Sequence, residues 1–198
     1  MALSQLTEPP MSISKRTKAD LNALIRDVAK GDRLALAELY RQMEKSIFAF
    51  AKSRLGDAET ASDVLQDVML TVWQKASAFR GGSQPRTWIL GITHHKILDV
   101  LRRQKRFTDA PDEEAIDIAP TPYDNADHGE RRAAVRQALG TLGDHHRQVV
   151  HLAFFEDLPY PEIARILEIP EGTVKSRMLH AKKILARRLR PLREGDLS

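Results

Sequence analysis

The sequence contains no cysteine among its 198 residues. This absence excludes disulfides, thiolate metal sites, direct thiol redox sensing and a cysteine nucleophile. A stress signal would therefore have to reach the protein through a partner. No apolar run approaches the roughly 20 residues needed to cross a bilayer, and residues 1–18 lack the basic and apolar segments of a signal peptide. We expect a cytoplasmic protein with no stable membrane insertion.

Catalytic patterns and strand patterns are also missing. No segment alternates polar and apolar residues as a half-buried strand does. We find no nucleophile beside a base, no glycine loop that would cradle a phosphate and no paired carboxylates with an evident task. His94, His95, His145, His146 and His151 include adjacent pairs, which point different ways on a helix. We therefore expect surface or DNA-facing histidines, and no catalytic residue, metal or cofactor.

Charge is distributed unevenly along the chain, although its total is only +4. Residues 86–106 carry six Lys or Arg and one acid, residues 107–130 carry eight acids and no base, and residues 171–190 carry seven bases. The acidic segment contains Pro111, Pro120 and Pro122 and has no sustained period. It reads as a flexible linker over 107–127, with an acidic solvated loop as the alternative on composition alone.

Helical periodicity dominates both sides of this segment. Apolar spacing predicts helices over 21–28, 36–55, 57–73 and 86–106 in the first half. Leu36, Leu39, Tyr40 and Met43 share the apolar face of the second helix, and Asp57 is placed to cap the third. The predicted fold class is all-α, with a flexible tail over 1–17 and a first helical domain over 18–106.

The second half predicts a small helical domain over 128–198 that contains a helix-turn-helix. Helices are expected over 129–139, 144–155, 160–167 and 171–189. Only Glu168, Ile169 and Pro170 separate the last two, which is the spacing of a DNA-binding helix-turn-helix.

The last predicted helix has one apolar and one polar face. An apolar stripe would pack on the preceding helix, and the opposite face would enter the major groove. An amphipathic helix with a solvated basic face is the plainer alternative, but the short helix and tight turn before it favour DNA. Lys175, Arg177 and Lys182 lie on the flanks, where phosphate contact is expected. The stripe comprises Val174, Met178, Ala181 and Leu185, and the outward face comprises Ser176, Leu179, His180 and Lys183.

Three segments resemble the extracytoplasmic-function (ECF) type of bacterial RNA polymerase sigma factor. Residues 158–177 (LPYPEIARILEIPEGTVKSR) resemble its promoter-reading C-terminal domain. Residues 57–73 (DAETASDVLQDVMLTVW) resemble its polymerase-binding helix. The Phe79-Arg-Gly sequence followed by Arg86-Thr-Trp-Ile resembles its base-capturing loop and the start of its promoter-melting helix. Together these similarities span about residues 20–189.

The resemblance implies specific contacts with polymerase and DNA. It places Asp63, Gln66, Asp67 and Leu70 against core RNA polymerase, whereas an ordinary acidic face is the alternative. The upstream duplex would contact Thr173, Lys175, Ser176, Arg177, Leu179, His180 and Lys183. The start-proximal, melted element would contact Phe79, Arg80, Gly81, Gly82, Ser83, Arg86, Trp88, Lys96, Arg102 and Arg103. A plain interhelical turn, or a helix on a membrane surface, would account for the same loop and basic helix.

Three positions depart from the family pattern. His95 stands where asparagine is frequent, Gly91 lies inside a predicted helix, and Glu168 replaces the glycine common in the turn. The resemblance implies core RNA polymerase, double-stranded and melted promoter DNA, and an anti-sigma factor as partners. A stand-alone helix-turn-helix regulator is the alternative, but it would not need the segments around 63–73 and 79–88.

Overall fold

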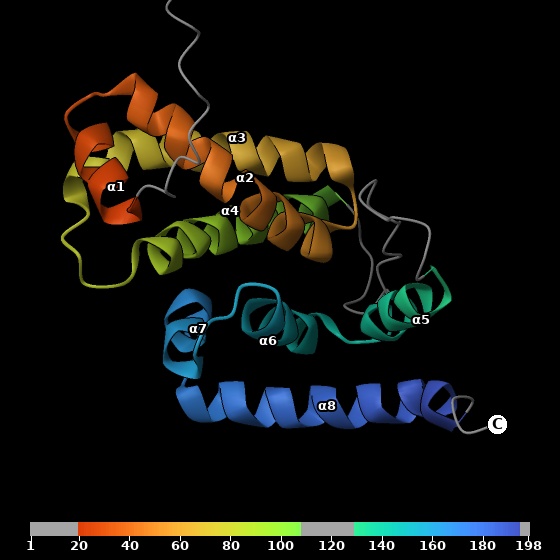
Figure 1. Cartoon of the computed structure of the whole chain (residues 1–198). Coiled ribbons are helices and arrows are strands. Elements are labelled where there is room, and N and C mark those ends of the chain that lie inside the picture. The colour runs from red at the N-terminus through yellow and green to blue at the C-terminus, as the bar shows by residue number, and fades with distance from the viewer. Residues whose placement is uncertain (1–19, 108–128, 195–198) are drawn as a thin grey trace, which may run out of the picture.

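The computed structural model describes residues 20–107 and 129–194 of the chain, and these residues contain helices and no strand. The predicted tail lies outside this range, as does all but the first residue of the predicted linker. The all-α class and the helix-turn-helix are confirmed (Figure 1). The elements are α1 (Leu21–Ala29), α2 (Arg33–Leu55), α3 (Ala58–Lys75), the 3-10 turn η1 (Ala76–Ala78), α4 (Pro85–Phe107), α5 (Gly129–Gly140), α6 (Asp144–Phe154), α7 (Tyr160–Leu167) and α8 (Glu171–Glu194).

Short polar side chains and glycines fix where the first helices begin and end. The Asp32 carboxylate accepts the backbone N–H of Leu34 at 2.7 Å, which caps α2. Gly56 ends α2 with a φ of 75°, and Asp57 then caps α3 as predicted. The Asp57 carboxylate accepts the hydroxyl of Thr60 at 2.6 Å and its N–H at 2.7 Å, and these bonds lower the pKa of Asp57.

Helices α1–α4 enclose an apolar core built from the predicted stripes. Leu39, Met43 and Ile47 of α2 are fully buried against α3 and α4. The expectation fails for Tyr40, which is 38% exposed at the edge of the stripe. Phe50 is fully buried instead, because its side of α2 is covered by the second half of the chain.

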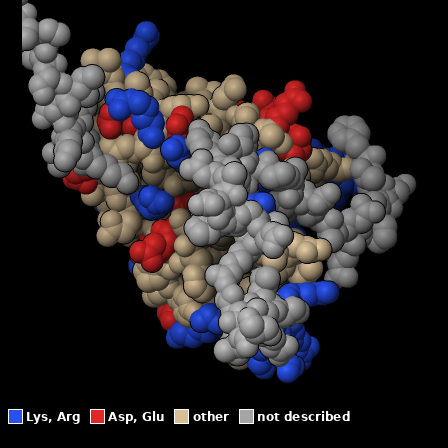
Figure 2. All heavy atoms as spheres, turned by 45° about the vertical axis from the view of Figure 1, so that its right-hand side comes forward, with Lys and Arg blue, Asp and Glu red and all other residues tan. Residues whose placement is uncertain are grey.

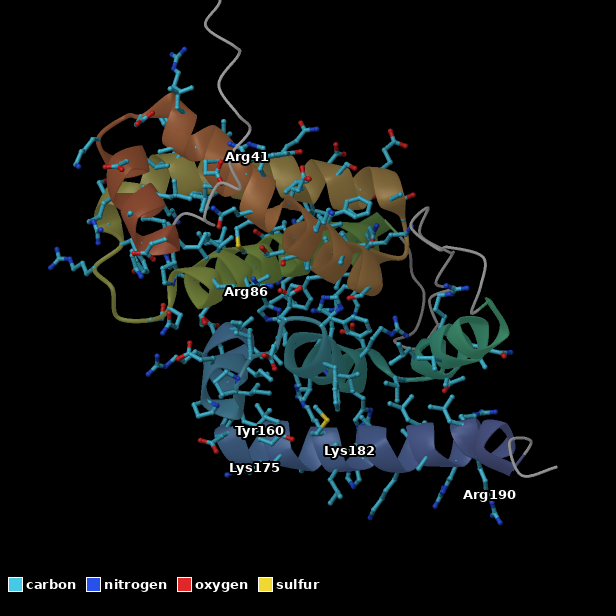
Figure 3. All side chains as sticks on the ribbon, in the orientation of Figure 1. Arg41, Arg86, Tyr160, Lys175, Lys182 and Arg190 are labelled. Carbon is cyan, nitrogen blue, oxygen red and sulfur yellow. The ribbon has the colours of Figure 1, made fainter. Side chains whose placement is uncertain are left out.

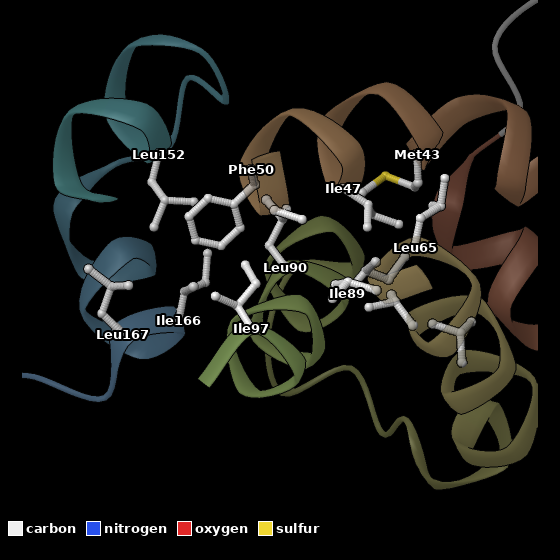
Figure 4. Close-up of a cluster of buried hydrophobic side chains, with 14 of the residues drawn as sticks. Met43, Ile47, Phe50, Leu65, Ile89, Leu90, Ile97, Leu152, Ile166 and Leu167 are labelled. Atoms are coloured by element: carbon white, nitrogen blue, oxygen red, sulfur yellow. The ribbon is translucent and has the colours of Figure 1, made fainter. Parts of the chain in front are cut away.

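The two helical halves pack directly against each other. Helix α2 lies against α6, and α4 lies against α7 (Figure 1). One buried cluster crosses the junction and joins Phe50, Leu90 and Ile97 to Leu152 and Ile166 (Figure 4). The described helices therefore share one continuous core, although the charge pattern suggested two lobes.

The turn between α7 and α8 keeps helix-turn-helix geometry in spite of Glu168. This residue adopts a left-handed backbone with a φ of 53°, which glycine would accept with less strain. The backbone N–H groups of Glu168 and Ile169 both donate to the carbonyl of Ala164, which closes α7. The departure at Glu168 therefore changes the local strain and leaves the turn intact.

Two glycines provide a matched test of backbone strain. An added Cβ would meet nothing within 4 Å at either Gly91, inside α4, or Gly81, where φ is +73°. Gly91→Ala should therefore raise the free energy of unfolding by about 0.5–1 kcal/mol, because alanine loses less backbone entropy in a helix. Gly81→Ala should lower it by about 1 kcal/mol through left-handed strain. Urea unfolding followed by circular dichroism measures both changes. Destabilisation by Gly91→Ala would contradict the conclusion that α4 has room for a side chain at position 91.

Candidate nucleic-acid interface

Helix α8 presents its predicted polar face away from the core. Val174, Met178 and Ala181 are buried, and Leu185 is half-buried against α5–α7. We call the opposite side of α8 the reading face. It consists of the exposed residues Ser176, Leu179, His180 and Lys183. The predicted phase of this helix is therefore confirmed.

Local contacts orient several side chains on and beside the reading face. The Ser176 hydroxyl donates to the Thr173 carbonyl at 3.0 Å, which leaves its oxygen available as an acceptor. Lys175 pairs with Glu171 at 2.7 Å, and this contact raises the pKa of Lys175. The ring of His180 meets that of His146 on α6 edge-on, at a centroid separation of 6.1 Å. Helical spacing could not predict that these two histidines meet, because the contact joins two different helices.

Basic side chains extend the reading face along α8. Figure 2 shows Lys and Arg gathered at the lower end of the molecule, and Figure 3 shows side chains of α8 projecting away from the other helices. Exposed cations along this face and on its flanks suit phosphate contact. The exposed bases of this stretch are Lys182, Lys183, Arg187, Arg188 and Arg190.

Helix α3 carries the predicted polymerase contacts on one exposed side, which we call the α3 face. Asp63, Gln66, Asp67 and Leu70 lie three or four residues apart and are all exposed. Leu70 is 55% exposed, which makes it an apolar spot among polar neighbours. Val64 and Val68, elsewhere on this helix, are buried, and Trp73 is half-buried.

The loop before α4 has a packed aromatic base and an open glycine tip. The rings of Phe79 and Trp88 lie with centroids 5.0 Å apart, and both are half-buried. Arg80, Gly81 and Gly82 are exposed, whereas Ser83 is half-buried. The structure therefore brings the predicted loop residues together at the start of α4.

Two basic residues of α4 form ion pairs with aspartate side chains. Lys96 lies 3.7 Å from Asp67, and Arg102 pairs with Asp99 at 3.0 Å. Arg103 is exposed near the end of the helix. All three cations lie along one helix, and Lys96 and Arg102 pair with carboxylates of the first half of the chain.

Arg86 makes a contact that no local pattern could reveal. Its guanidinium donates to Ser46 Oγ at 2.9 Å and to the carboxylate of Glu156, two residues beyond the end of α6. Glu156 is only 6% exposed, and its other oxygen lies 3.6 Å from His151 Nε2. Burial raises the pKa of Glu156, but the interaction with His151 and the charge of Arg86 outweigh burial and hold that pKa below its usual value.

Two histidines contradict the expectation that these residues lie on the surface or face DNA. His94 is 5% and His151 7% exposed, because both lie where the two halves of the chain meet. The His151 ring stacks on Phe50 at 5.3 Å and on Phe155 at 5.2 Å. Within the described residues, no three His, Asp or Glu side chains form a group that could hold a metal ion. In that same part of the chain no helix is long and apolar enough to span a membrane.

Family comparisons agree with this geometry. Residues 39–107 match Sigma-70 region 2, and residues 132–185 match Sigma-70, region 4. These two regions, in this order, define the class of sigma factors. The ECF RNA polymerase sigma factor SigK of Mycobacterium tuberculosis is 31% identical over 188 residues, which cover 91% of this chain and 96% of SigK. SigM of the same species is 33% identical over 181 residues, covering 91% of this chain and 90% of SigM. The chain therefore belongs to the ECF sigma factor family.

Solved structures share the fold. The sigma factor RpoE of Bartonella quintana, crystallised with the anti-sigma factor NepR, superposes with a TM-score of 0.64 at 25% identity. The match covers 78% of this chain and 96% of RpoE. CnrH, solved in complex with the cytosolic domain of CnrY, gives a TM-score of 0.63 at 22% identity, over 86% of this chain and 97% of CnrH.

The buried His94 predicts acid sensitivity of the fold. Burial and the charge of Arg54 lower the pKa of His94 from 6.5 to about 4. As the pH falls, His94 is therefore protonated in the unfolded chain before it is protonated in the folded chain. Its contribution to the free energy of unfolding is fully present above about pH 6.5 and is lost as the pH falls toward 4. The loss from this group should be about 2 kcal/mol between pH 7.5 and pH 5. Urea unfolding at these two values should show a smaller loss for His94→Gln than for the native chain. His145→Gln, an exposed control, should keep the native dependence.

Proposed function

We propose that α8 reads an upstream promoter element, that the loop before α4 receives a base of the melted start-proximal element, and that the α3 face binds core RNA polymerase. The observation that carries this proposal is the reading face, which is exposed, polar and opposite the packing stripe, directly after a short helix and a three-residue turn. A helix presented in this way fits the major groove of duplex DNA.

Each part of the reading face has a suitable chemistry. Ser176 can accept a hydrogen bond from a base edge, and Lys183 can donate one to guanine or to phosphate. Leu179 is 54% exposed and can contact a thymine methyl. Lys175, Arg177 and Thr173 lie at the flank and beginning of α8, where contacts with the DNA backbone would set the register.

The start-proximal loop suits the capture of an unstacked base. Extruding a base costs a few kcal/mol, which contacts in a pocket can offset. Gly81 and Gly82 allow close approach of the DNA backbone, and Phe79 and Trp88 provide a firm base beneath them. Lys96, Arg102 and Arg103 would add salt-dependent attraction to phosphates without reading sequence.

The α3 face provides the polymerase contact that a sigma factor needs. Acidic residues around the exposed Leu70 combine a charged rim with an apolar centre, as protein interfaces do. We propose that the protein is a cytoplasmic initiation factor without catalytic activity or cofactor. We also propose that an anti-sigma factor restrains it, as the anti-sigma factor NepR is bound to RpoE of Bartonella quintana. A stand-alone helix-turn-helix regulator is disfavoured, because such a protein has no use for a region 2 fold.

Transcription with purified core polymerase tests the proposal. The chain should convert core polymerase into an enzyme that initiates at specific sites on upstream DNA fragments of the source genome. The chain alone should bind the same fragments weakly, because polymerase holds the two DNA-contacting halves at a fixed spacing. Leu70→Ala changes an exposed residue and should reduce initiation without loss of folding. Absence of initiation with the native chain would refute the assignment.

Substitutions on α8 separate base reading from phosphate contact. Ser176→Ala and His180→Ala should each cost about 1–3 kcal/mol at the cognate upstream element and relax base preference there. Lys182→Ala, on the flank, should instead weaken binding to all sequences and reduce its dependence on salt. Selection from a randomised duplex measures base preference, and titration of the cognate duplex at several salt concentrations measures affinity and its salt dependence. Native base preference in the Ser176 and His180 variants would exclude these side chains as readers.

A further inference from the structure

The rotamer of His180 decides whether this residue can read a base edge. Its backbone is held in place by Met178 and Ala181, which are buried in the packing stripe of α8. The imidazole itself is exposed, and an exposed side chain on a rigid helix can still occupy several staggered rotamers. A hydrogen bond to a base needs a narrow range of distance and angle, and a side chain that DNA must first immobilise loses entropy on binding.

A ring contact from another helix restricts this imidazole. The ring of His146, in the first turn of α6, meets the ring of His180 with a centroid separation of 6.1 Å and an interplanar angle of 75°. Aromatic rings prefer such edge-to-face arrangements at separations of about 4.5–7 Å. The contact therefore favours the rotamer of His180 in which the two rings meet. His180 is still exposed in this arrangement, so His146 does not cover the reading face.

His146 is a firm support for this contact, because its own surroundings are packed. It is half-buried, and every residue that follows it on α6 from Arg147 to Leu152 is buried. A Cβ added at Gly143, the residue before α6, would lie 3.8 Å from His146 Nδ1, which is an ordinary van der Waals contact. The ring of His146 therefore lies beside the backbone at Gly143 as well as against His180, and both neighbours limit its movement.

The charge state of His146 suits a position beside the basic face of α8. Burial, followed by the charges of His180, Arg177 and His145, lowers the pKa of His146. The uncharged ring is therefore favoured near neutral pH, and it does not repel the cations of α8. A lysine or arginine at this position would stand against Arg177. A neutral aromatic ring can thus contact the reading face at low electrostatic cost.

We propose that His146 is a positioning residue for base reading, which holds the ring of His180 in the rotamer that meets the upstream DNA element. This inference rests on the proposed function of the reading face and adds to it a residue of α6 that acts through His180. Restriction of the His180 ring in the free protein removes part of the entropy loss that DNA binding would otherwise carry. The base preference of α8 then depends on its packing against α6.

The base preference of the complete holoenzyme tests the proposal. A promoter fragment found by transcription with the native chain is randomised over its upstream element, and the fragments that core polymerase binds with each full-length variant are sequenced. Discrimination is the ratio by which the bound fragments favour the native base pair at a position over the other three. His146→Ala should reduce discrimination about threefold to tenfold at the base pair that His180→Ala affects, and at no other. Native discrimination in His146→Ala would overturn the proposal.

Three further variants separate positioning from a merely structural role. His146→Ala combined with His180→Ala should discriminate as well as His180→Ala alone, because a positioning residue has no effect without the reader that it holds. His146→Phe keeps an aromatic ring against His180 and should retain discrimination within about twofold of the native chain. His145→Ala, at the exposed neighbouring position on α6, should keep the native base preference. Additive losses in the double variant, or a loss in His146→Phe as large as in His146→Ala, would overturn the proposal.

Failure of this inference and failure of the proposed function give different results. If the native holoenzyme shows no base preference in the upstream element, or if His180→Ala keeps the native preference, the assignment of the reader fails and the positioning role fails with it. If His180→Ala loses the preference and His146→Ala keeps it, only the positioning role fails. Circular dichroism and urea unfolding check that each variant folds. If His146→Ala does not fold, His146→Gln, which keeps a polar side chain without the ring, takes its place with the same expected loss.

Discussion

The arrangement of the whole structure depends on how one buried arginine is neutralised. Arg54, at the end of α2, is 1% exposed, and the carboxylate that balances it comes from Asp144 at the start of α6. The neighbouring Arg147 donates to the Leu142 carbonyl at 2.7 Å and to the Ser53 carbonyl at 3.3 Å. It thereby ties the turn after α5 to the end of α2. A buried charge without such partners would be very costly, so these bonds fix where the second half can dock.

The apolar side chains pack in the arrangement of the two halves that these ion pairs and hydrogen bonds fix. Helix α4 contacts α2 and α3 on one side and α7 on the other, and it carries buried residues toward both. Ile89 is buried beside Met43 and Ile47, while Ile97 lies toward Ile166 (Figure 4). A helix with two buried sides cannot keep a broad polar face, which explains why His94 is drawn into the interior.

Local signals account for what the sequence predicted correctly. Asp57 caps α3, Gly56 ends α2, and the 168–170 turn needs only neighbouring residues, so these features were found without a structure. The phase of α8 also follows from helical spacing, whereas the residues of the α3 face were predicted from the resemblance to the family. Contacts between distant segments could not be found in this way. Arg86 and Glu156 are 70 residues apart, and no period in the chain indicates that they meet or that His94 and His151 are buried.

The separation of reading from packing on α8 has an evolutionary consequence. The reading face contributes nothing to the buried stripe of Val174, Met178 and Ala181, so its residues can change with little effect on folding. After gene duplication, a few substitutions there could redirect one copy to a new set of genes while both copies kept the same fold and the same polymerase contact. If the reading face selects DNA as proposed, regulons can diverge within a genome on this scaffold, because its residues are not the residues that hold the protein together.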